Sequence, residues 1–537
     1  MPSQPLKFDY AAIGLACALS RRNANRTVAL AVPNDWNGDV RRLAAAVDTS
    51  ATSRAHSAVV NLVQHMKREG KSTSNIGIYL SARPTNADKG MFIEQVHDNS
   101  YLNYVDGGTV YFIRPTHANR HGVPSPAGAP PRHHVSVGVA AITLLNDPRS
   151  WFEEVESWDQ ESVTIRHGGR QYTVPIAGPD RGMMRKFLRV TARVAHVRTH
   201  TAPLAGSVPA FALPATADLG STYTSFSLTG RRFFDSIFAY TAMALVPARL
   251  NAVDGAPVSG LQGHNVGAVL ASSSASILSW GLNFGQINAT LHAEVSLIKA
   301  WQTAHGGATP IPPGSRLYTT LEPCFMCAGQ IAAYGDVRDF TIIYVQADPK
   351  FNPLPTFLED ARLETFTPDD LGLTYRGKGV DWQTRLATTQ ARLVQHAVGK
   401  KKKSYQESAI SVLNKEASQA RRFAKAAWDL AELGDQITEN ELLSGNQRGT
   451  LLSAWSAAMR LVMLAGGHLP AGTALTRVHL TSYMNRLGVY LDDTAHQNTL
   501  RAAAEPAYAA RALGQGIVVV NKYQMRALAL AERIAID

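Results

Sequence analysis

The strongest constraint on how this chain of 537 residues can fold comes from two short segments rich in metal-binding side chains. The first is His292–Glu294 (HAE), and the second is Pro323–Cys327 (PCFMC). Each stands in a run with helical character, and the β-rich run Ser315–Thr320 lies between them. A fold that uses both segments for one metal ion therefore has to bring two helices together across a strand.

The residue types in these segments suit a catalytic zinc ion. His292, Cys324 and Cys327 supply one nitrogen and two thiolates, which leaves a fourth position open for water. The cysteines are three apart and share one face of a helix, whose free N–H groups favour the thiolate. Zinc lowers the pKa of water toward neutrality, and Glu294 is near enough to move protons without being a ligand. We expect one zinc ion per chain, with Glu294 as the catalytic acid–base.

The pattern H-x-E followed by P-C-x-x-C is typical of zinc-dependent nucleobase deaminases. The only other cysteine is Cys17, so no second C-x-x-C pair completes a four-cysteine structural site. Cys17 lies in the apolar run Ala11–Leu19, which we interpret as a buried helix because no basic segment precedes it. The pattern therefore favours a deaminase over a redox pair or a structural zinc site.

Residues 230–350 resemble the cytidine and deoxycytidylate deaminase superfamily, and within it the bacterial tRNA-specific adenosine deaminase branch. The likeness is carried by Leu317–Ile331 (LYTTLEPCFMCAGQI) and Val266–Leu270 (VGAVL). It implies a mixed sheet of about five strands flanked by helices. In that family an asparagine at the end of the second strand binds the nucleoside, and Asn283 stands in the matching place. We assign substrate binding to Asn283 and to Ala293.

Patterning divides the chain into three regions. Residues 1–228 are predicted to form an N-terminal α/β domain, with buried strands at Thr27–Val32 and Ile76–Ser81 and a hairpin at Val163–Val174. Residues 229–375 alternate helix and strand and form the deaminase domain, an α/β fold. Residues 376–537 are predicted to be mostly helical. A loop rich in proline, histidine and glycine covers Thr116–His134, and no internal repeat is evident.

The charge of the chain favours a polyanionic partner, although a solubilising surface charge is the alternative. The formal net charge is +11, and residues 376–537 hold 21 Lys and Arg against 13 Asp and Glu, including the run Lys400–Lys403. No apolar stretch is long enough to span a bilayer, so no membrane partner is expected. The few cysteines suit a reducing compartment, and we expect the cytoplasm.

These observations predict hydrolytic deamination of cytosine or adenine. Charge and the additional regions favour single-stranded DNA or RNA as the substrate, because a duplex hides the target carbon. A free nucleoside or nucleotide deaminase is the first alternative. A non-catalytic nucleic-acid-binding protein with a deaminase fold is the second, and the presence of Glu294 argues against it. The sequence leaves the oligomeric state open.

Overall fold

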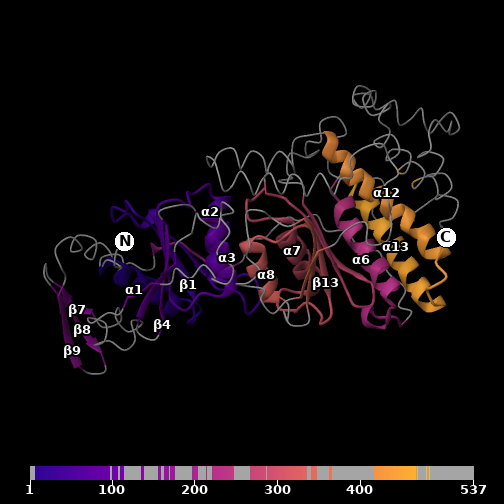
Figure 1. The fold of residues 1–537 in the computed structure, drawn as a ribbon. Coiled ribbons are helices and arrows are strands. Elements are labelled where there is room, and N and C mark those ends of the chain that lie inside the picture. The colour runs from indigo at the N-terminus through magenta and orange to yellow at the C-terminus, as the bar shows by residue number, and fades with distance from the viewer. Residues whose placement is uncertain are drawn as a thin grey trace.

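The structure is a computed structural model. Its N-terminal elements lie at one end of the molecule, and its C-terminal helices lie at the other. Two β-sheets stand side by side with α3 and α8 between them, and a layer of helices covers the far side of the second sheet (Figure 1). The loop Thr116–His134 and the run Lys400–Lys403 lie outside the described residues. The described residues are 7–96, 100–106, 109–113, 135–137, 155–158, 162–167, 170–175, 196–202, 213, 220–246, 266–285, 287–334, 340–346, 362–365, 417–466, 469, 479 and 483.

The N-terminal sheet has the strand order β10-β2-β1-β3-β4-β5-β6. Its strands are β1 (Val28–Pro33), β2 (Ala44–Val47), β3 (Ile76–Leu80), β4 (Tyr101–Asp106), β5 (Thr109–Ile113), β6 (Val135–Val137) and β10 (Thr199–His200). Its helices are α1 (Lys7–Arg22), α2 (Ala58–Arg68) and α3 (Asn86–Gln95). The strands predicted from Thr27 and from Ile76 are confirmed as β1 and β3. The helix predicted at Ala11–Leu19 is confirmed within α1, where Cys17 is buried.

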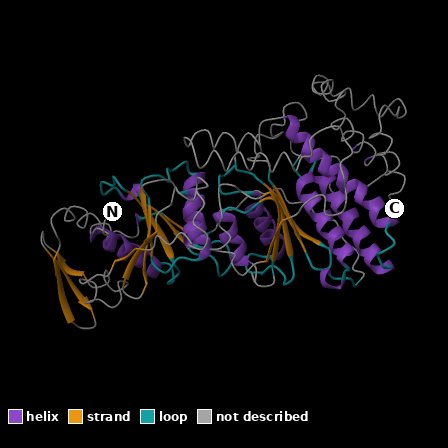
Figure 2. Ribbon diagram, viewed as in Figure 1, coloured by secondary structure: helices purple, strands orange, loops and turns teal. Residues whose placement is uncertain are grey.

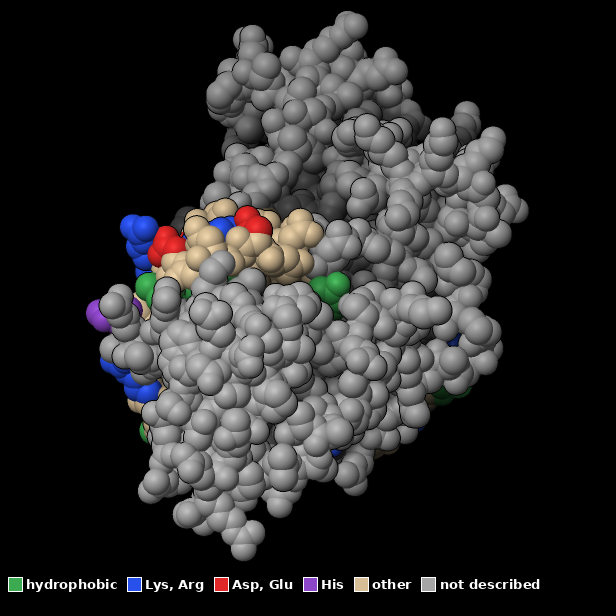
Figure 3. Space-filling model, turned by 90° about the vertical axis from the view of Figure 1, so that its left-hand side faces the viewer, with side chains coloured by type: hydrophobic (Ala, Val, Ile, Leu, Met, Phe, Trp, Pro, Cys, Tyr) green, Lys and Arg blue, Asp and Glu red, His purple; other side chains and the backbone are tan. Residues whose placement is uncertain are grey.

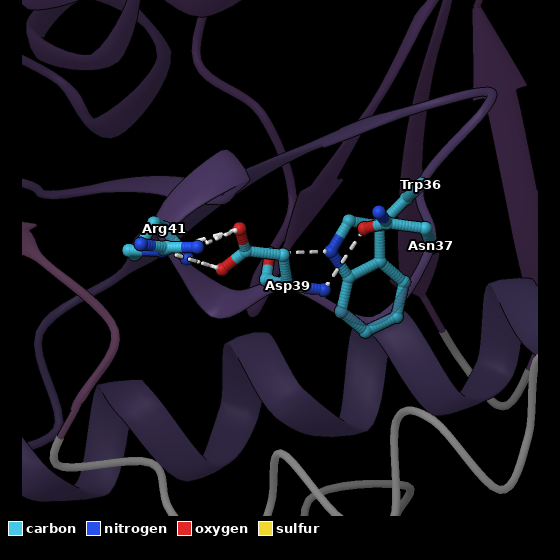
Figure 4. A network of polar contacts seen from close by, with 4 residues as sticks. All are labelled: Trp36, Asn37, Asp39 and Arg41. Atoms are coloured by element: carbon cyan, nitrogen blue, oxygen red, sulfur yellow. Dashed lines mark hydrogen bonds and ion pairs between the residues drawn. The ribbon is translucent and has the colours of Figure 1, made fainter.

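A polar loop with a short 3-10 helix, η1 (Val40–Arg42), connects β1 to β2. The Trp36 indole donates to the carbonyl oxygen of Asp39 at 2.8 Å, and the Asp39 carboxylate pairs with Arg41 at 2.9 Å (Figure 4). The Asp39 backbone N–H donates to Asn37 Oδ1 at 3.1 Å. Local side-chain bonds of this kind satisfy backbone groups that would otherwise need a sheet or helix partner.

A separate antiparallel sheet contains the predicted hairpin. It consists of β7 (Val155–Trp158), β8 (Ser162–His167) and β9 (Arg170–Pro175). Val163 pairs with Val174, and His167 pairs with Arg170 at the end of the hairpin. The hairpin prediction around Gly168-Gly169 is therefore confirmed.

The second large sheet is mixed and has the order β12-β11-β13-β14-β15. Its strands are β11 (Gly267–Ala271), β12 (Ile277–Leu282), β13 (Arg316–Leu321), β14 (Thr341–Gln346) and β15 (Arg362–Thr365). The helices α6 (Leu228–Ala244), α7 (Ala293–His305) and α8 (Phe325–Tyr334) flank it (Figure 2). β11 is antiparallel to β12 and β13, while β13, β14 and β15 are parallel. Helices on both faces explain why β11 is apolar and buried throughout, and the predicted fold class is confirmed.

Two long helices of the C-terminal region, α12 (Ala417–Glu439) and α13 (Gly445–Ala465), pack on α6 and on each other. A Cβ atom on Gly434 would lie 2.5 Å from the Trp455 ring, so glycine lets the two helices approach closely. The Trp455 indole donates to the Leu430 carbonyl at 2.7 Å. The predicted helical character is confirmed for the described residues 417–466, and these helices extend the core. Among the described residues, no helix has the length and apolar character needed to cross a membrane.

Candidate active site

The starts of α7 and α8 bring the metal-binding side chains together. His292 is the N-cap residue of α7, and Glu294 lies in its first turn. Cys324 immediately precedes α8, and Cys327 lies in the first turn of that helix. A Cβ atom on Gly281 of β12 would lie 2.2 Å from the carbonyl oxygen of Ala293, so glycine lets α7 pack closely on the sheet. The predicted pair of helices around one strand is therefore present.

The three predicted ligands have the spacing of a tetrahedral zinc site. Cys324 Sγ lies 3.4 Å from His292 Nδ1 and 3.5 Å from Cys327 Sγ, and Cys327 Sγ lies 3.6 Å from His292 Nδ1. Ordinary Zn–S and Zn–N bond lengths in a tetrahedron give about 3.5 Å between sulfur and nitrogen and about 3.8 Å between the sulfurs. Among the described residues, this is the one such group whose ligand atoms all lie within 4.8 Å. The donor set and the distances fit zinc.

Glu294 is buried beside this group. Its Oε1 accepts a hydrogen bond of 2.8 Å from Thr319 Oγ1, and its Oε2 lies 3.2 Å from Cys327 Sγ. Burial raises the pKa of Glu294, and it also raises the pKa values of the Cys324 and Cys327 thiols. A cation at the centre of the group would reverse this preference in the thiols and stabilise both thiolates.

The hydroxyl group of Thr319 was not predicted from sequence to belong to the site. Thr319 lies in β13 with no exposed surface, and its side chain fixes one carboxylate oxygen of Glu294. A threonine in a strand is typical of ordinary β-structure, so its residue type gives no signal. A threonine in the middle of a strand buried on both faces is more informative, because its hydroxyl needs a partner.

The two residues predicted to bind substrate lie at the ends of elements that meet at the site. Asn283 directly follows β12 and is buried, and its Oδ1 accepts a hydrogen bond of 2.8 Å from the Gly285 backbone N–H. Ala293 is the first residue of α7 and is fully buried between His292 and Glu294. Because β12 packs on α7, these residues stand on the same framework as the ligands. Their contact with substrate stays a prediction.

A buried charged network supports the sheet. Arg316 donates to Asp235 at 3.1 Å and to Glu364 at 2.8 Å, and Tyr318 donates to Asp235 at 2.6 Å. The Arg316 guanidinium also lies 3.8 Å from the centre of the Tyr223 ring. These contacts tie α6, β13 and β15 together, and β13 carries Thr319 at the site. None of the residues in this network was predicted from the sequence to have a role.

Comparison with known families agrees with the geometry. Residues 262–362, which include the metal-binding group and Glu294, match the family model of the Bd3614-like deaminases, a cytidine deaminase-like family. No curated protein and no solved structure matches the chain. The predicted resemblance to the deaminase superfamily is confirmed, and the chain contains a Bd3614-like deaminase domain at residues 262–362.

Proposed function

We propose that this protein is a zinc-dependent hydrolytic deaminase of cytosine or adenine. The observation that carries the proposal is the buried carboxylate of Glu294, which lies 3.2 Å from one sulfur of a zinc-compatible group without belonging to that group. A structural zinc site has no use for such a group. A catalytic site needs it to move protons.

The residues of the site divide the chemistry between them. His292, Cys324 and Cys327 would hold zinc, which supplies a Lewis acid that activates water at neutral pH. Glu294 takes a proton from the attacking water and delivers protons to the ring nitrogen and to the departing amine. The products are the keto base and ammonia, so one water is consumed for each amine released. Thr319 holds Glu294 in place, and Asn283 orients the base.

We further propose that the base is presented in single-stranded DNA or RNA. Most of the excess of positive charge lies in residues 376–537, and α12 carries Arg421, Arg422 and Lys425 at helical spacing. At the opposite end of the molecule, the visible described side chains carry both signs of charge close together (Figure 3). We also propose the cytoplasm as the location of the protein, because free cysteines suit a reducing compartment.

The catalytic proposal is tested with purified full-length protein. Ammonia release is measured with cytidine, adenosine, their monophosphates, and single-stranded DNA and RNA containing either base. The protein should hold one zinc ion per chain, and Glu294→Ala should keep the zinc while losing turnover by at least about 10²–10⁴-fold. Cys324→Ala with Cys327→Ala should lose the metal. A zinc-free wild-type protein, or a Glu294→Ala variant with normal ammonia release, would refute the proposal.

The polynucleotide proposal is tested by salt dependence. Binding of single-stranded DNA and RNA is measured at several salt concentrations for the wild type and for a variant with Arg421, Arg422 and Lys425 changed to glutamine. The logarithm of the association constant falls linearly as the logarithm of the salt concentration rises. For single strands, this dependence should become shallower by about 0.7 for every phosphate that the variant no longer neutralises. An equal salt dependence in the wild type and the variant would show that these three residues of α12 do not contact the nucleic acid. Turnover of mononucleotides without binding of either polymer would favour a free-nucleotide enzyme.

A further inference from the structure

The N-terminal unit, which we define as the elements from α1 to β5, repeats the fold of the deaminase domain. In each, a helix precedes an antiparallel strand pair, and a helix, a strand, a helix and two strands follow. The strand orders are β2-β1-β3-β4-β5 and β12-β11-β13-β14-β15, so the first strand lies between the second and third in both sheets. The sheets differ at the last pair, since β5 is antiparallel to β4 and β15 is parallel to β14.

The register of the strands is also the same in the two sheets. Ala29 of β1 pairs with Leu80 of β3, and Ala268 of β11 pairs with Thr319 of β13. Leu80 lies six residues before Asn86, the first residue of α3, and Thr319 lies six residues before Phe325, the first residue of α8. A shared order of strands can arise in unrelated sheets, but a shared register identifies residues that correspond one to one.

The correspondence extends to the helix that carries the histidine and the glutamate. Ser57 is the N-cap residue of α2, as His292 is of α7, and an alanine follows in both helices. Val59 then stands where Glu294 stands. The N-terminal unit therefore has neither an imidazole ligand nor a proton shuttle at these positions.

The cysteine positions are also replaced, and a hydrogen-bonded carboxylate fills the space. α3 and α8 each have 10 residues, with Thr85 in the place of Cys324 and Asp88 in the place of Cys327. One oxygen of Asp88 accepts from the Val59 N–H at 2.7 Å, and the other accepts from the Thr85 N–H at 2.9 Å and hydroxyl at 2.8 Å. These bonds satisfy the buried carboxylate through protein groups alone. The N-terminal unit therefore lacks the donor set of a catalytic zinc site.

The two units meet through corresponding helices in a reciprocal contact. A Cβ atom on Gly90 of α3 would lie 2.2 Å from the carbonyl oxygen of Phe325, and one on Gly329 of α8 would lie 2.5 Å from that of Asn86. Asn86 and Phe325 are the first residues of their helices, and both glycines are the fifth. A contact in which each partner offers the same patch is typical of a two-fold dimer. Here one chain supplies both halves.

The reciprocal contact has a second consequence at the unused site. A cavity of about 510 Å³ lies over it, lined by Thr85 and Asn86 of the N-terminal unit and by Ala332 and Ala333 from α8 of the other unit. Its volume is that of a pocket for a small molecule. A pocket therefore lies over the unused site, and the neighbouring unit closes one side of it.

By the same symmetry, we expect α3 to close one side of a pocket over the metal-binding group. Glu94 is the ninth residue of α3 and Ala333 is the ninth residue of α8, so Glu94 corresponds to Ala333. Glu94 is half-buried and lies one helical turn beyond Gly90, on the face turned to α8. Asn86 faces Gly329, and Gly90 faces Phe325, the residue after Cys324. The next turn of α3, which carries Glu94, therefore lies at the start of α8, beside the zinc-binding group.

We propose that the N-terminal unit is a non-catalytic copy of the deaminase fold that completes the catalytic pocket, with Glu94 as a hydrogen-bond acceptor for the substrate. The proposal rests on the function proposed above, since it adds a residue to the same site. A nucleoside offers several donors, its exocyclic amine and its sugar hydroxyl groups, and an ionised carboxylate accepts from them strongly. The second unit thus supplies part of the recognition surface and none of the metal chemistry.

The test compares Glu94→Gln with Ala333→Gln, which places the same amide at the corresponding position over the unused site. With the substrate that the wild type turns over best, Glu94→Gln should lower kcat/KM by about 10–100-fold, mainly through KM, as expected for loss of a charged hydrogen bond. Zinc content and thermal midpoint should stay at wild-type values. Ala333→Gln should behave as the wild type, and Glu94→Asp should recover part of the loss.

A readout without turnover separates this proposal from the catalytic one. In the cobalt-substituted protein, titration with cytidine or adenosine should change the visible absorption of the metal, with a higher midpoint concentration in Glu94→Gln. If the wild type binds nucleoside without turnover and Glu94→Gln weakens the binding, the catalytic proposal fails and this one stands. If Glu94→Gln and Ala333→Gln match the wild type in both KM and binding, Glu94 is not part of the pocket.

Discussion

Thr319 donates a hydrogen bond of 2.8 Å to Glu294, and neither side chain has appreciable contact with water. The hydroxyl fixes one carboxylate oxygen and leaves the other on the side of Cys327. In the N-terminal copy the corresponding residue is Leu80, beside a position where Val59 replaces the glutamate. The hydroxyl donor and the glutamate are therefore present together in one unit and absent together in the other.

The first prediction concerns this bond. Thr319→Val keeps the shape of the side chain but removes the donor, so kcat should fall by about tenfold, equivalent to one net hydrogen bond. Thr319→Ser keeps the hydroxyl and serves as the control. Steady-state ammonia release and zinc content check the result. Equal kcat values for the valine variant and the wild type would show that Glu294 is positioned by other groups.

The second prediction separates the two functions of Asn283. Its Oδ1 holds a turn by accepting from Gly285, and Asp48 of the N-terminal copy holds the matching turn by accepting from Ser50 at 2.6 Å. Asn283→Asp should therefore fold normally but lose the amide donor, lowering kcat/KM by about tenfold or more. Thermal midpoint and kcat/KM are measured together. An unchanged kcat/KM would limit Asn283 to the turn.

The third prediction concerns the network under the sheet. Asp235→Ala leaves Arg316 buried without one of its two carboxylate partners, which should lower the free energy of unfolding by about 3–5 kcal/mol. Asp35→Ala breaks an exposed ion pair with Arg42 and should change the free energy of unfolding little. Urea unfolding of both variants makes the comparison. Similar midpoints would mean that the buried network adds no stability.

The fourth prediction concerns pH. Burial lowers the pKa of His56 to about 3, helped by the charge of Lys299, while its Nδ1 donates to Asn61 at 3.1 Å. Since the folded pKa is below the usual value, the unfolded chain binds the proton more readily. Stability is therefore complete above about pH 6.5 and falls with acidification toward about pH 3, by about 1.4 kcal/mol per pH unit.

His56→Gln removes this titration while keeping a side chain that can donate to Asn61. Urea midpoints of the two proteins between pH 7.5 and pH 4.5 should diverge below about pH 6.5, with the wild type losing stability faster. Acid effects on other groups are common to both proteins and cancel in the difference. Parallel curves would show that His56 titrates alike in the folded and unfolded chain.

The sequence predicted which side chains come together, because metal binding depends on a few residue types at fixed spacing. His292, Cys324 and Cys327 have no close substitutes as zinc ligands in this pattern, and the apolar runs of β11 and β13 stand where strands were expected. Asn283 was placed at the end of a strand, as observed. The boundaries at residues 228 and 375 stay predictions.

The repeated fold could not be predicted, because many different sequences can form the same strand order and pack the same core. Alternative apolar residues fill corresponding core positions equally well, so Leu80 and Thr319 share a place without sharing chemistry. Positions that must match are few, such as Gly90 and Gly329, where any side chain would strike the facing backbone. An isolated glycine in a sequence does not indicate a close contact between helices. The contact is seen only in the structure, where both helices are present.

The close approach of α3 and α8 also bears on how the protein is made. On the ribosome, α3 is synthesised well before α8, so the flat face around Gly90 is ready before its partner emerges. The nascent chain therefore carries its own template for the helix that follows Cys324. A shortened chain that starts at α6 would leave that helix facing water on the side where α3 belongs. Translation therefore supplies the two helices in the order in which this contact can be built.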